Sequence, residues 1–542
     1  MLQPIYLVAS GDMRPAANQE CEPAQAAMEK RIVFAIEGLG GTVKRAHPYD
    51  PVKKHGFIDS QHYGIDVFHS IPPNNPVIVA EAVWQYSHHV LAGLLWHKGP
   101  ILTIANWSGE WPGLVGLLNL NACMAKAGLR YSSLWSEDFT DKFFLGGLKH
   151  WLKTESVTHK TTHTVPYSLI KINDKDRRHG RRFANQFVQR KAILGVFDEG
   201  CMGMYNAIIP DEYLHGIGIF KERLSQSTLY AKMLTVKDDE ARGVYKWLAA
   251  KGMKFNLGKD EATELTEHQV LEQCKMYIAA VRLADEFDCD AIGIQYQQGL
   301  KDLTPASDLA EGLLNNVDRP SVYHETSGKE LFKGEAIPHF NEVDECAGVD
   351  SLITYRIWKE LGFSPENTLH DLRWGRWYKG DGIDDFVWVL EISGAAPPAH
   401  FIDGYRGATS ERQPPMYFRL GGGTIKGISK PGYVVWSRIF IERGLMYYDT
   451  GIGEVVQLPE KETEERWRLT TPQWPIMHLV LRGITRDEMM ARHMSNHIQV
   501  VYAPDFASAK RGMQVKATTM HSLGFIVNYA GDFWTDDFPG KQ

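Results

Sequence analysis

Hydrophobic and polar positions along the first part of the chain follow the rhythm of strands that alternate with helices. Short apolar runs typical of buried strands are separated by longer stretches with helical spacing. The expected strands are residues 5–8, 77–80 and 101–105, and the expected helices are residues 25–39, 83–95 and 114–127. This order predicts a parallel sheet covered by helices.

The same rhythm starts again after a polar, basic segment at residues 171–191. That segment lacks apolar periodicity, and we interpret it as a connection between domains. Further strands are expected at residues 192–197, 291–295 and 321–323, with helices at residues 267–287 and 309–315. These elements predict a second α/β domain.

Beyond about residue 350 the pattern changes to short β-rich runs separated by loops rich in glycine and proline. The expected strands are residues 386–392, 433–440, 453–457 and 498–502. Such spacing favours a β-barrel or sandwich. We therefore expect an α/β protein with domains at residues 1–188, 189–348 and 349–542.

Composition narrows the classes of protein that fit this pattern. The chain has 542 residues, 44% hydrophobic and 23% charged, which leaves room for two to four well-buried domains. Its formal net charge of −7 argues against a general surface for nucleic acid or anionic membrane. The N-terminus has no basic n-region, and the apolar stretch at residues 77–104 is interrupted by polar side chains. Six cysteines without a CxxC pattern fit a reducing compartment, so we expect a soluble cytoplasmic protein.

Three potential metal ligands stand beside expected strands that are far apart in sequence. Glu325 follows an apolar run, Asp371 follows another, and His497 precedes a third. Two carboxylates and an imidazole suit a divalent cation with open coordination positions. From the residues alone, an ion pair or helix cap is the favoured explanation of each carboxylate, and a lone histidine is commonly a core residue. The chain has no HExxH, EF-hand or zinc-type spacing.

Two turns at the carboxyl ends of expected strands are further candidates for ligand contact. One carries Gly200 and Gly203, but it is neither a GxGxxG nor a Walker sequence, and close backbone packing or a wall for a small polyol suits it better. The other carries Gln297 and Gln298, whose amides both donate and accept hydrogen bonds.

Seven short motifs in one order resemble the L-fucose isomerase family, which is related in fold to L-arabinose isomerase. The likeness runs along most of the chain. The motifs are Gly200-Cys201-Met202-Gly203, residues 291–299, residues 311–315, Tyr323-His324-Glu325-Thr326, His370-Asp371-Leu372-Arg373, the loops at residues 392–396 and 417–423, and Ser495-Asn496-His497 after Trp474-Pro475.

The resemblance implies two Rossmann-like α/β domains followed by a β-rich, barrel-like C-terminal domain. It implies Mn²⁺, or another divalent cation, held by Glu325, Asp371 and His497. It also implies a homo-oligomer, a trimer or hexamer, in which a neighbouring subunit helps to close the site. Members of the family interconvert open-chain aldoses and ketoses.

The residue types suit that reaction. Glu325 and Asp371 are expected to move protons between C1 and C2 of an L-fucose-like or related hexose, as a general acid and base. Asn496, Gln297 and Gln298 are candidate hydroxyl binders. Three tryptophans are candidates for stacking on the sugar, although an ordinary core position is the favoured explanation of each: Trp84, Trp374 and Trp474.

The chain departs from the family where substrate is recognised. Thr424 and Lys426 follow the triple-glycine loop where the fucose enzymes have a tyrosine, and Arg492 lies in a run where those enzymes carry a tryptophan. Lys426 and Arg492 lead to the hypothesis of an anionic sugar terminus. Two other classes remain open: a metal-independent two-carboxylate glycoside hydrolase and a non-catalytic sugar-binding protein.

Overall fold

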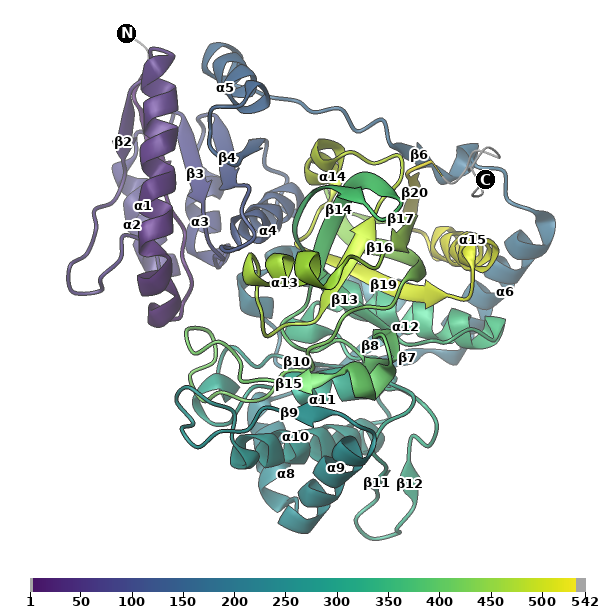
Figure 1. The fold of residues 1–542 in the computed structure, drawn as a ribbon. Helices are drawn as coiled ribbons and strands as arrows, with labels where there is room; N and C mark the ends of the chain where they lie inside the picture. Colours follow the sequence, from purple (N-terminus) through teal and green to yellow (C-terminus); the bar gives the residue numbers. More distant parts are fainter. Residues whose placement is uncertain (1–2, 533–542) are drawn as a thin grey trace.

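The chain is described by a computed structural model that covers residues 3–532. It is an α/β protein with two parallel sheets and a larger mixed sheet (Figure 1). In the part of the chain that is described, no helix combines the length and the apolar character needed to cross a bilayer.

The N-terminal sheet is parallel, with strand order β2-β1-β3-β4-β5. Its strands are β1 (Ile5–Val8), β2 (Val43–Arg45), β3 (Val77–Glu81), β4 (Ile101–Asn106) and β5 (Ser132–Ser136). Its helices are α1 (Pro15–Gly38), α2 (Gln61–Ser70), α3 (His88–Trp96), α4 (Gly113–Lys126) and α5 (Lys142–Thr154). Buried side chains of α1 and α5 share one apolar cluster with the sheet, and those of α2, α3 and α4 share another. The sheet is therefore covered on both faces, as the sequence predicted.

The second sheet has the order β10-β7-β8, from β7 (Ala192–Phe197), β8 (Ile219–Leu224) and β10 (Ala291–Ile294). An extended segment around His339 continues it, because Ile292 and His339 form a parallel bridge. The helices here are α7 (Asp211–Gly216), α8 (Gln226–Thr235), α9 (Asp238–Ala250), α10 (Glu267–Glu286), α11 (Asp308–Leu314) and α12 (Glu345–Leu361). A small parallel pair, β9 (Lys254–Phe255) with β15 (Thr409–Ser410), connects this region to a C-terminal loop.

The expected strand at residues 321–323 does not belong to this parallel sheet. It is β11 (Val322–Tyr323), which pairs antiparallel with β12 (Glu330–Leu331) to form a separate hairpin. The sequence of so short a strand does not show which strand it pairs with, because two apolar residues look the same in a parallel sheet and in a hairpin.

The C-terminal sheet closes on itself. Six strands follow the order β16-β19-β13-β14-β18-β17, and β17 pairs back with β16. They are β13 (Asn367–Gly380), β14 (Ile383–Glu391), β16 (Gly432–Glu442), β17 (Leu445–Val455), β18 (Ile476–Val480) and β19 (His497–Ala503). The helices α13 (Glu460–Arg468), α14 (Arg486–Arg492) and α15 (Phe506–Ser522) are inserted between or follow these strands. A closed ring of strands leaves no free edge between them, as in a barrel.

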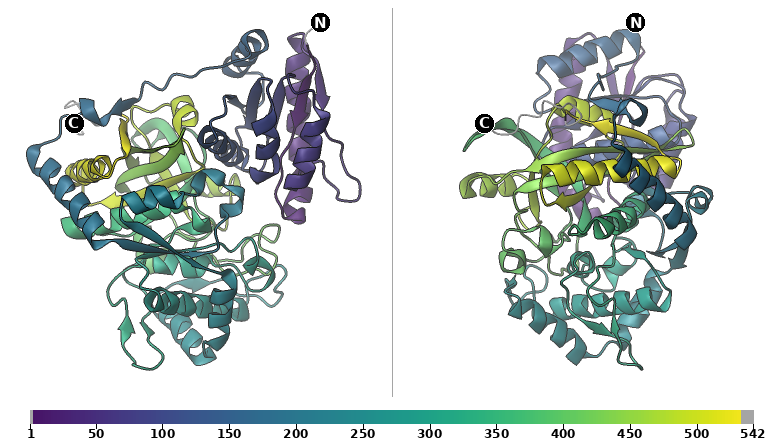
Figure 2. Two further views of the ribbon diagram at one scale, coloured as in Figure 1. Left: turned by 180° about the vertical axis from the view of Figure 1, so that it is seen from behind. Right: turned by 90° about the vertical axis from the view of Figure 1, so that its right-hand side faces the viewer.

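The basic segment at residues 171–191 is a helix, not an irregular connection. α6 (Asp174–Arg190) starts at Asn173, whose side chain accepts a hydrogen bond from the backbone N–H of Asp176. Its narrow buried stripe includes Phe183 and Phe187, and it packs beside α15 (Figure 2). β6 (Thr164–Pro166) likewise joins β20 (Ile526–Ala530) at the margin of the mixed sheet. Seven of the nine residues at positions 174–182 are charged, and this masks the apolar stripe in the sequence.

Candidate active site

A cavity of about 270 Å³ lies where the N-terminal sheet, the second sheet and the barrel meet. One wall is apolar and includes Trp84, Trp111, Val115, Met202 and Trp474. The polar wall includes Gln297, Glu342, Asp371, Ser393 and Asn496. A mostly apolar cavity with a few convergent polar groups is the usual form of a small-molecule site.

Two carboxylates in this wall converge on one histidine. Nε2 of His497 lies 3.6 Å from an oxygen of Glu342 and 3.6 Å from Oδ1 of Asp371. His497 is 1% exposed, whereas the two carboxylates are accessible from the cavity. The three side chains are close, although among residues 3–532 no group of three or more His, Cys, Asp or Glu side chains is placed so that it could hold a metal ion as it stands.

Strand pairing places Asp371 beside His497. β13 and β19 run antiparallel, and Asp371 and His497 are directly opposite each other in the register. Asp371 is therefore in the interior of a long strand and not at a strand end. The register of β13 with β14 shifts immediately afterwards, between Leu372 and Trp374, and such a bulge re-aims neighbouring side chains.

A strained turn places Glu342. It follows the extended segment at residues 338–340, which hydrogen-bonds through its backbone to Ile292 of β10. Glu342 and Val343 both have left-handed backbones, with φ of 57° and 53°. That region is unfavourable for residues other than glycine, and most of all for a β-branched one. This turn directs the Glu342 carboxylate into the cavity.

Nδ1 of His497, on the side of the ring away from Glu342 and Asp371, contacts a buried ion pair between Asp344 and Arg438. Nδ1 of His497 lies 2.7 Å from Oδ2 of Asp344, and that oxygen also accepts a hydrogen bond of 2.6 Å from Arg438. Burial alone would raise the pKa of Asp344, but Arg438 and His497 hold it well below its ordinary value. An ionised carboxylate only accepts hydrogen bonds, so Nδ1 carries a proton, and Nε2 faces Glu342 and Asp371.

Burial and mutual charge shift the pKa values of all three groups. Burial raises the pKa of Glu342 to about 7, although His497 opposes the shift. Burial also raises the pKa of Asp371, against His497 and Asn496. Burial would lower the pKa of His497, but the carboxylates around it raise it instead. Two carboxylates beside one imidazole, with a further carboxylate behind that imidazole, are residue types from which divalent-cation sites are built.

The amides predicted to bind hydroxyl groups have different positions. Nδ2 of Asn496 donates to Asp371 over 3.1 Å, and its Oδ1 has no hydrogen-bond partner among the described residues. Nε2 of Gln297 lies 3.4 Å from an oxygen of Glu342. Both line the cavity, whereas Gln298 is outside the lining and approaches Gly200 instead. Asn496 and Gln297 are thus the two amides that reach the cavity.

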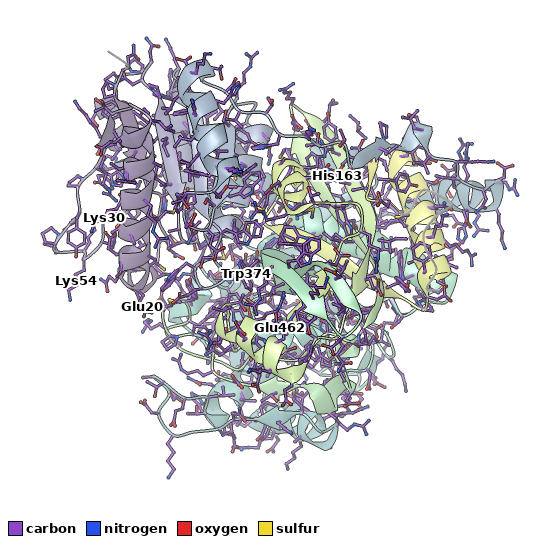
Figure 3. All side chains as sticks on the ribbon, turned by 45° about the horizontal axis from the view of Figure 1, so that its top comes forward. Glu20, Lys30, Lys54, His163, Trp374 and Glu462 are labelled. Carbon is purple, nitrogen blue, oxygen red and sulfur yellow. The ribbon has the colours of Figure 1, made fainter. Side chains whose placement is uncertain are left out.

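The predicted aromatic residues are also divided. Trp84 and Trp474 are in the cavity wall, and Nε1 of Trp474 donates to Gln413 over 2.7 Å. Trp374 belongs to the buried cluster on the barrel, near Arg376 and Arg466. Figure 3 shows Trp374 and Glu462 in the middle of the molecule. Trp374 is therefore a packing residue.

Glu325 needs correction, because the structure does not bring it to Asp371 and His497. It lies in the turn between β11 and β12, where its carboxylate pairs with Lys232 at 3.2 Å and Arg282 at 3.4 Å. Its side chain is 44% exposed, and the hairpin projects from the lower end of the molecule in Figure 1. Glu342 occupies the place that sequence reasoning gave to Glu325.

The residues at which the chain departs from the fucose isomerases are also outside the cavity lining. Lys426 pairs with Glu411 at 3.2 Å and lies over the ring of Trp467. Arg492 forms a bidentate pair with Asp449, with bonds of 2.7 and 3.0 Å. Thr424 is buried, and its hydroxyl accepts the backbone N–H of Glu411.

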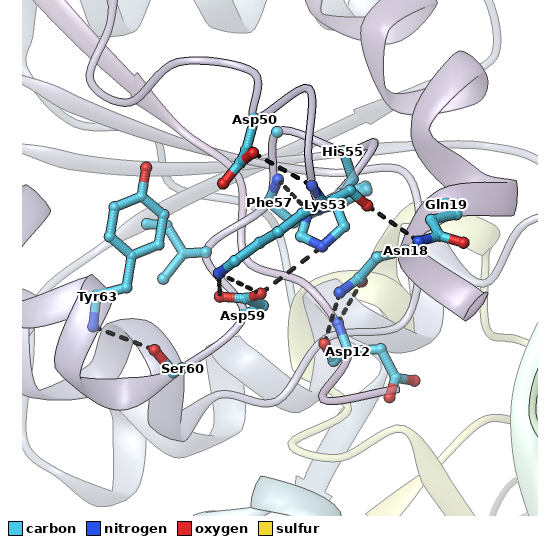
Figure 4. Close-up of polar contacts among 12 residues, drawn as sticks. Asp12, Asn18, Gln19, Asp50, Lys53, His55, Phe57, Asp59, Ser60 and Tyr63 are labelled. Carbon is cyan, nitrogen blue, oxygen red and sulfur yellow. Dashed lines mark hydrogen bonds and ion pairs between the residues drawn. The ribbon is translucent and has the colours of Figure 1, made fainter. Parts of the chain in front are cut away.

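Two arginines that sequence reasoning missed do line the cavity. Arg14 bonds the carboxylate of Asp12 through two nitrogens and lies 4.8 Å from the ring centroid of Tyr417. It follows β1, while Trp84 follows β3. These neighbouring strands leave the sheet at its topological switch point, where ligands commonly bind. Asn18 hydrogen-bonds to both backbone groups of Asp12 (Figure 4). The carboxylate of Asp12 binds Arg14.

Arg373 forms the second cationic part of the wall. Its Nε lies 3.6 Å from Glu391, and one terminal nitrogen donates to the backbone oxygen of Glu110. Its Nε and Nη1 have no hydrogen-bond partner among the described residues. Burial raises the pKa of Glu391 to about 7, with Arg373 opposing the shift. Arg373 thus has donors to offer to a bound molecule.

No model of a known protein family matches the chain, and no curated protein matches it. The geometry of the cavity and the resemblance of its motifs are therefore the basis for a function.

Proposed function

We propose that the chain is a metal-dependent aldose–ketose isomerase that acts on an open-chain monosaccharide. The observation that carries the proposal is the convergence of Glu342 and Asp371 on Nε2 of His497 at the wall of a 270 Å³ cavity. The motif resemblance to the L-fucose isomerase family supports the same reaction. Glu342 replaces Glu325 in the proposed site.

Glu342, Asp371 and His497 would hold the cation, for which we propose Mn²⁺. A bound divalent cation supplies Lewis-acid polarisation of the sugar's carbonyl oxygen. His497 is suited to this role because Asp344 fixes its tautomer and orientation. The raised pKa values of both carboxylates fall back when positive charge is placed between them.

The same two carboxylates are suited to proton transfer between C1 and C2. A carboxylate held beside the C1–C2 bond can take a proton from one carbon and return it to the other. Asp371 is held in orientation by Asn496, and Glu342 has Gln297 beside it. We propose that Oδ1 of Asn496 and the amide of Gln297 bind sugar hydroxyl groups.

The charges of the wall support a neutral sugar over an anionic one. Arg14 is paired with Asp12, and Arg373 faces Glu391 and keeps N–H donors that are unpaired among the described residues and can serve a neutral hydroxyl group. The two cations on which the anionic hypothesis rested, Lys426 and Arg492, are paired elsewhere. Trp84 and Trp474 offer apolar faces against which the sugar's carbon skeleton can pack.

Cytoplasmic location and assembly into trimers or hexamers, with a neighbouring subunit near the site, belong to the same proposal. They rest on the sequence and the family resemblance.

The test uses the full chain with Mn²⁺ and a panel of aldoses that includes L-fucose, related neutral hexoses and matching uronic acids. Ketose is followed by NMR with and without a chelator. We expect ketose from a neutral aldose, loss of activity with chelator and recovery with Mn²⁺. Metal-independent hydrolysis of a glycoside, or sugar binding without any ketose, would contradict the proposal.

A further inference from the structure

A buried carboxyl outside the cavity is hydrogen-bonded to the turn that holds Glu342. Glu311 lies on α11 and is 3% exposed. One of its oxygens accepts a hydrogen bond from Nδ2 of Asn341, the residue immediately before Glu342. Its other oxygen accepts a hydrogen bond from the hydroxyl of Ser307. Neither Glu311 nor Asn341 lines the cavity.

The turn has two anchors, one at each end of its strained residues. Glu342 and Val343 have left-handed backbones, and the backbone N–H of Asp344 closes the turn onto the oxygen of Asn341 over 3.1 Å. Asp344 is anchored by Arg438 and His497. The side chain of Asn341 is anchored by Glu311, to which its Nδ2 donates. Strained backbone persists only where its surroundings over-determine it.

The segment that leads into the turn is held by other residues. Asn315 bonds both backbone groups of His339, and Phe340 donates to Ile292. The ring of His339 accepts the backbone N–H of Ile294, and its Nδ1 lies 3.9 Å from Glu311. Residues 338–340 are therefore held mainly by Asn315 and by the backbone of β10. The contribution that belongs to Glu311 is therefore the orientation of Asn341 and of the residue after it.

Glu311 is suited to this role in its uncharged form. Burial raises its pKa well above the ordinary value, and the neighbouring carboxylate of Asp308 raises it further. A neutral carboxyl has the same shape and nearly the same hydrogen-bonding capacity as a glutamine side chain. Glutamine at position 311 can therefore replace it, whereas a small apolar residue cannot.

We propose that Glu311 is a positioning residue for Glu342, which acts by clamping Asn341 and so holding the left-handed turn in the geometry that binds the cation. This inference rests on the proposed function for its consequence, because the clamp matters where Glu342 is a metal ligand. Residues that orient metal ligands from outside commonly change metal affinity by roughly 10- to 100-fold.

The experiment compares Glu311→Ala, Glu311→Gln and Asn341→Ala with the wild-type chain. The control is Glu81→Ala, which removes another fully buried glutamate, on β3 of the N-terminal sheet. Mn²⁺ affinity is measured by electron paramagnetic resonance, and hydrogen exchange is measured in peptides that cover residues 339–345. Circular dichroism establishes the folded fraction of each variant.

We expect Glu311→Ala and Asn341→Ala to weaken Mn²⁺ binding by roughly 10- to 100-fold and to accelerate exchange in residues 339–345. Glu311→Gln is expected to stay within about threefold of wild type, and Glu81→Ala to change neither readout. If Glu311→Ala does not fold, Asn341→Ala and Glu311→Gln decide the question.

Unchanged Mn²⁺ affinity and exchange in a folded Glu311→Ala or Asn341→Ala variant would overturn the inference, as would equal changes in Glu81→Ala. A wild-type chain that binds no Mn²⁺, together with faster exchange confined to the Glu311→Ala and Asn341→Ala variants, would refute the proposed function and leave the clamp intact.

Discussion

Asp371 and His497 are direct partners across the antiparallel strands β13 and β19, and the carboxylate of one lies 3.6 Å from Nε2 of the other. The backbone register of a rigid barrel thus sets the separation of two of the three proposed ligands. The third, Glu342, comes from a strained turn at the end of a different sheet. The candidate site thus combines two residues on paired barrel strands with one residue on a strained turn.

Replacing Asp344 by asparagine tests the support of His497. The change leaves Arg438 and the imidazole N–H without their carboxylate, so we expect Mn²⁺ affinity to fall by roughly 10- to 100-fold. Removing one partner of a buried ion pair also costs about 3–5 kcal/mol of stability. Calorimetric Mn²⁺ titration and urea unfolding measure the two effects. Wild-type affinity in a folded Asp344→Asn protein would show that the imidazole is oriented without Asp344.

Replacing Asp371 by asparagine tests proton transfer. The amide cannot take a proton from carbon, so we expect turnover to fall by roughly 10²- to 10⁴-fold at saturating Mn²⁺. Asp384→Asn on β14 is the matched control, because Asp384 is an exposed carboxylate that pairs with Lys379. Its turnover is expected to stay within about twofold of wild type. Equal turnover in the two variants would remove Asp371 from the reaction.

His478 gives a pH dependence of stability. It is 1% exposed, neither ring nitrogen has a hydrogen-bond partner in the described chain, and burial lowers its pKa to about 3. The unfolded chain takes up this proton near pH 6.5 and the folded chain does not, so His478 destabilises the fold progressively as pH falls from about 6.5 towards 3.

Replacing His478 by leucine removes that contribution. Between pH 7 and pH 5 we expect the free energy of unfolding of His478→Leu to lose about 2 kcal/mol less than that of the wild type. Urea unfolding at the two pH values measures the difference, and at pH 7 each protein serves as its own reference. A stability difference that is the same at both pH values would show that His478 is protonated in the folded chain.

Lys426 tests the recognition of charge. Because it pairs with Glu411 and lies over Trp467, we expect Lys426→Ala to leave the ratio of kcat/KM for neutral and anionic aldoses within about twofold of wild type. Glu411→Ala controls for loss of the pair itself. A drop in kcat/KM of Lys426→Ala for the uronic acids alone would instead support the hypothesis that Lys426 recognises an anionic sugar.

Sequence patterns identified most of the elements that frame the site. The expected strands at residues 5–8 and 192–197 match β1 and β7, and the expected helix at residues 267–287 matches α10 to within one residue. These elements have strong apolar periodicity or clear caps, such as the capping box of Thr266 and Gln269. Where local signals agree with burial, sequence and structure coincide.

Glu342 was out of reach of the same reasoning. It follows an extended segment that forms a single parallel bridge, and its left-handed backbone is set by contacts with residues distant in sequence, Glu311 and Arg438. The one local signal was the N-cap, Asp344, which precedes α12 and accepts the backbone N–H of Ala347. Glu325 was the stronger candidate in the sequence because it follows an apolar run, but that run forms a strand of the β11–β12 hairpin.

The most direct test of the site compares Mn²⁺ binding by wild type, Glu342→Gln and Glu325→Gln, measured by electron paramagnetic resonance on the full chain. We predict one tight Mn²⁺ per chain for wild type and for Glu325→Gln, with affinity at least about tenfold weaker for Glu342→Gln. Wild-type affinity in Glu342→Gln, or weakened binding in Glu325→Gln alone, would contradict the assignment of Glu342 as the third ligand.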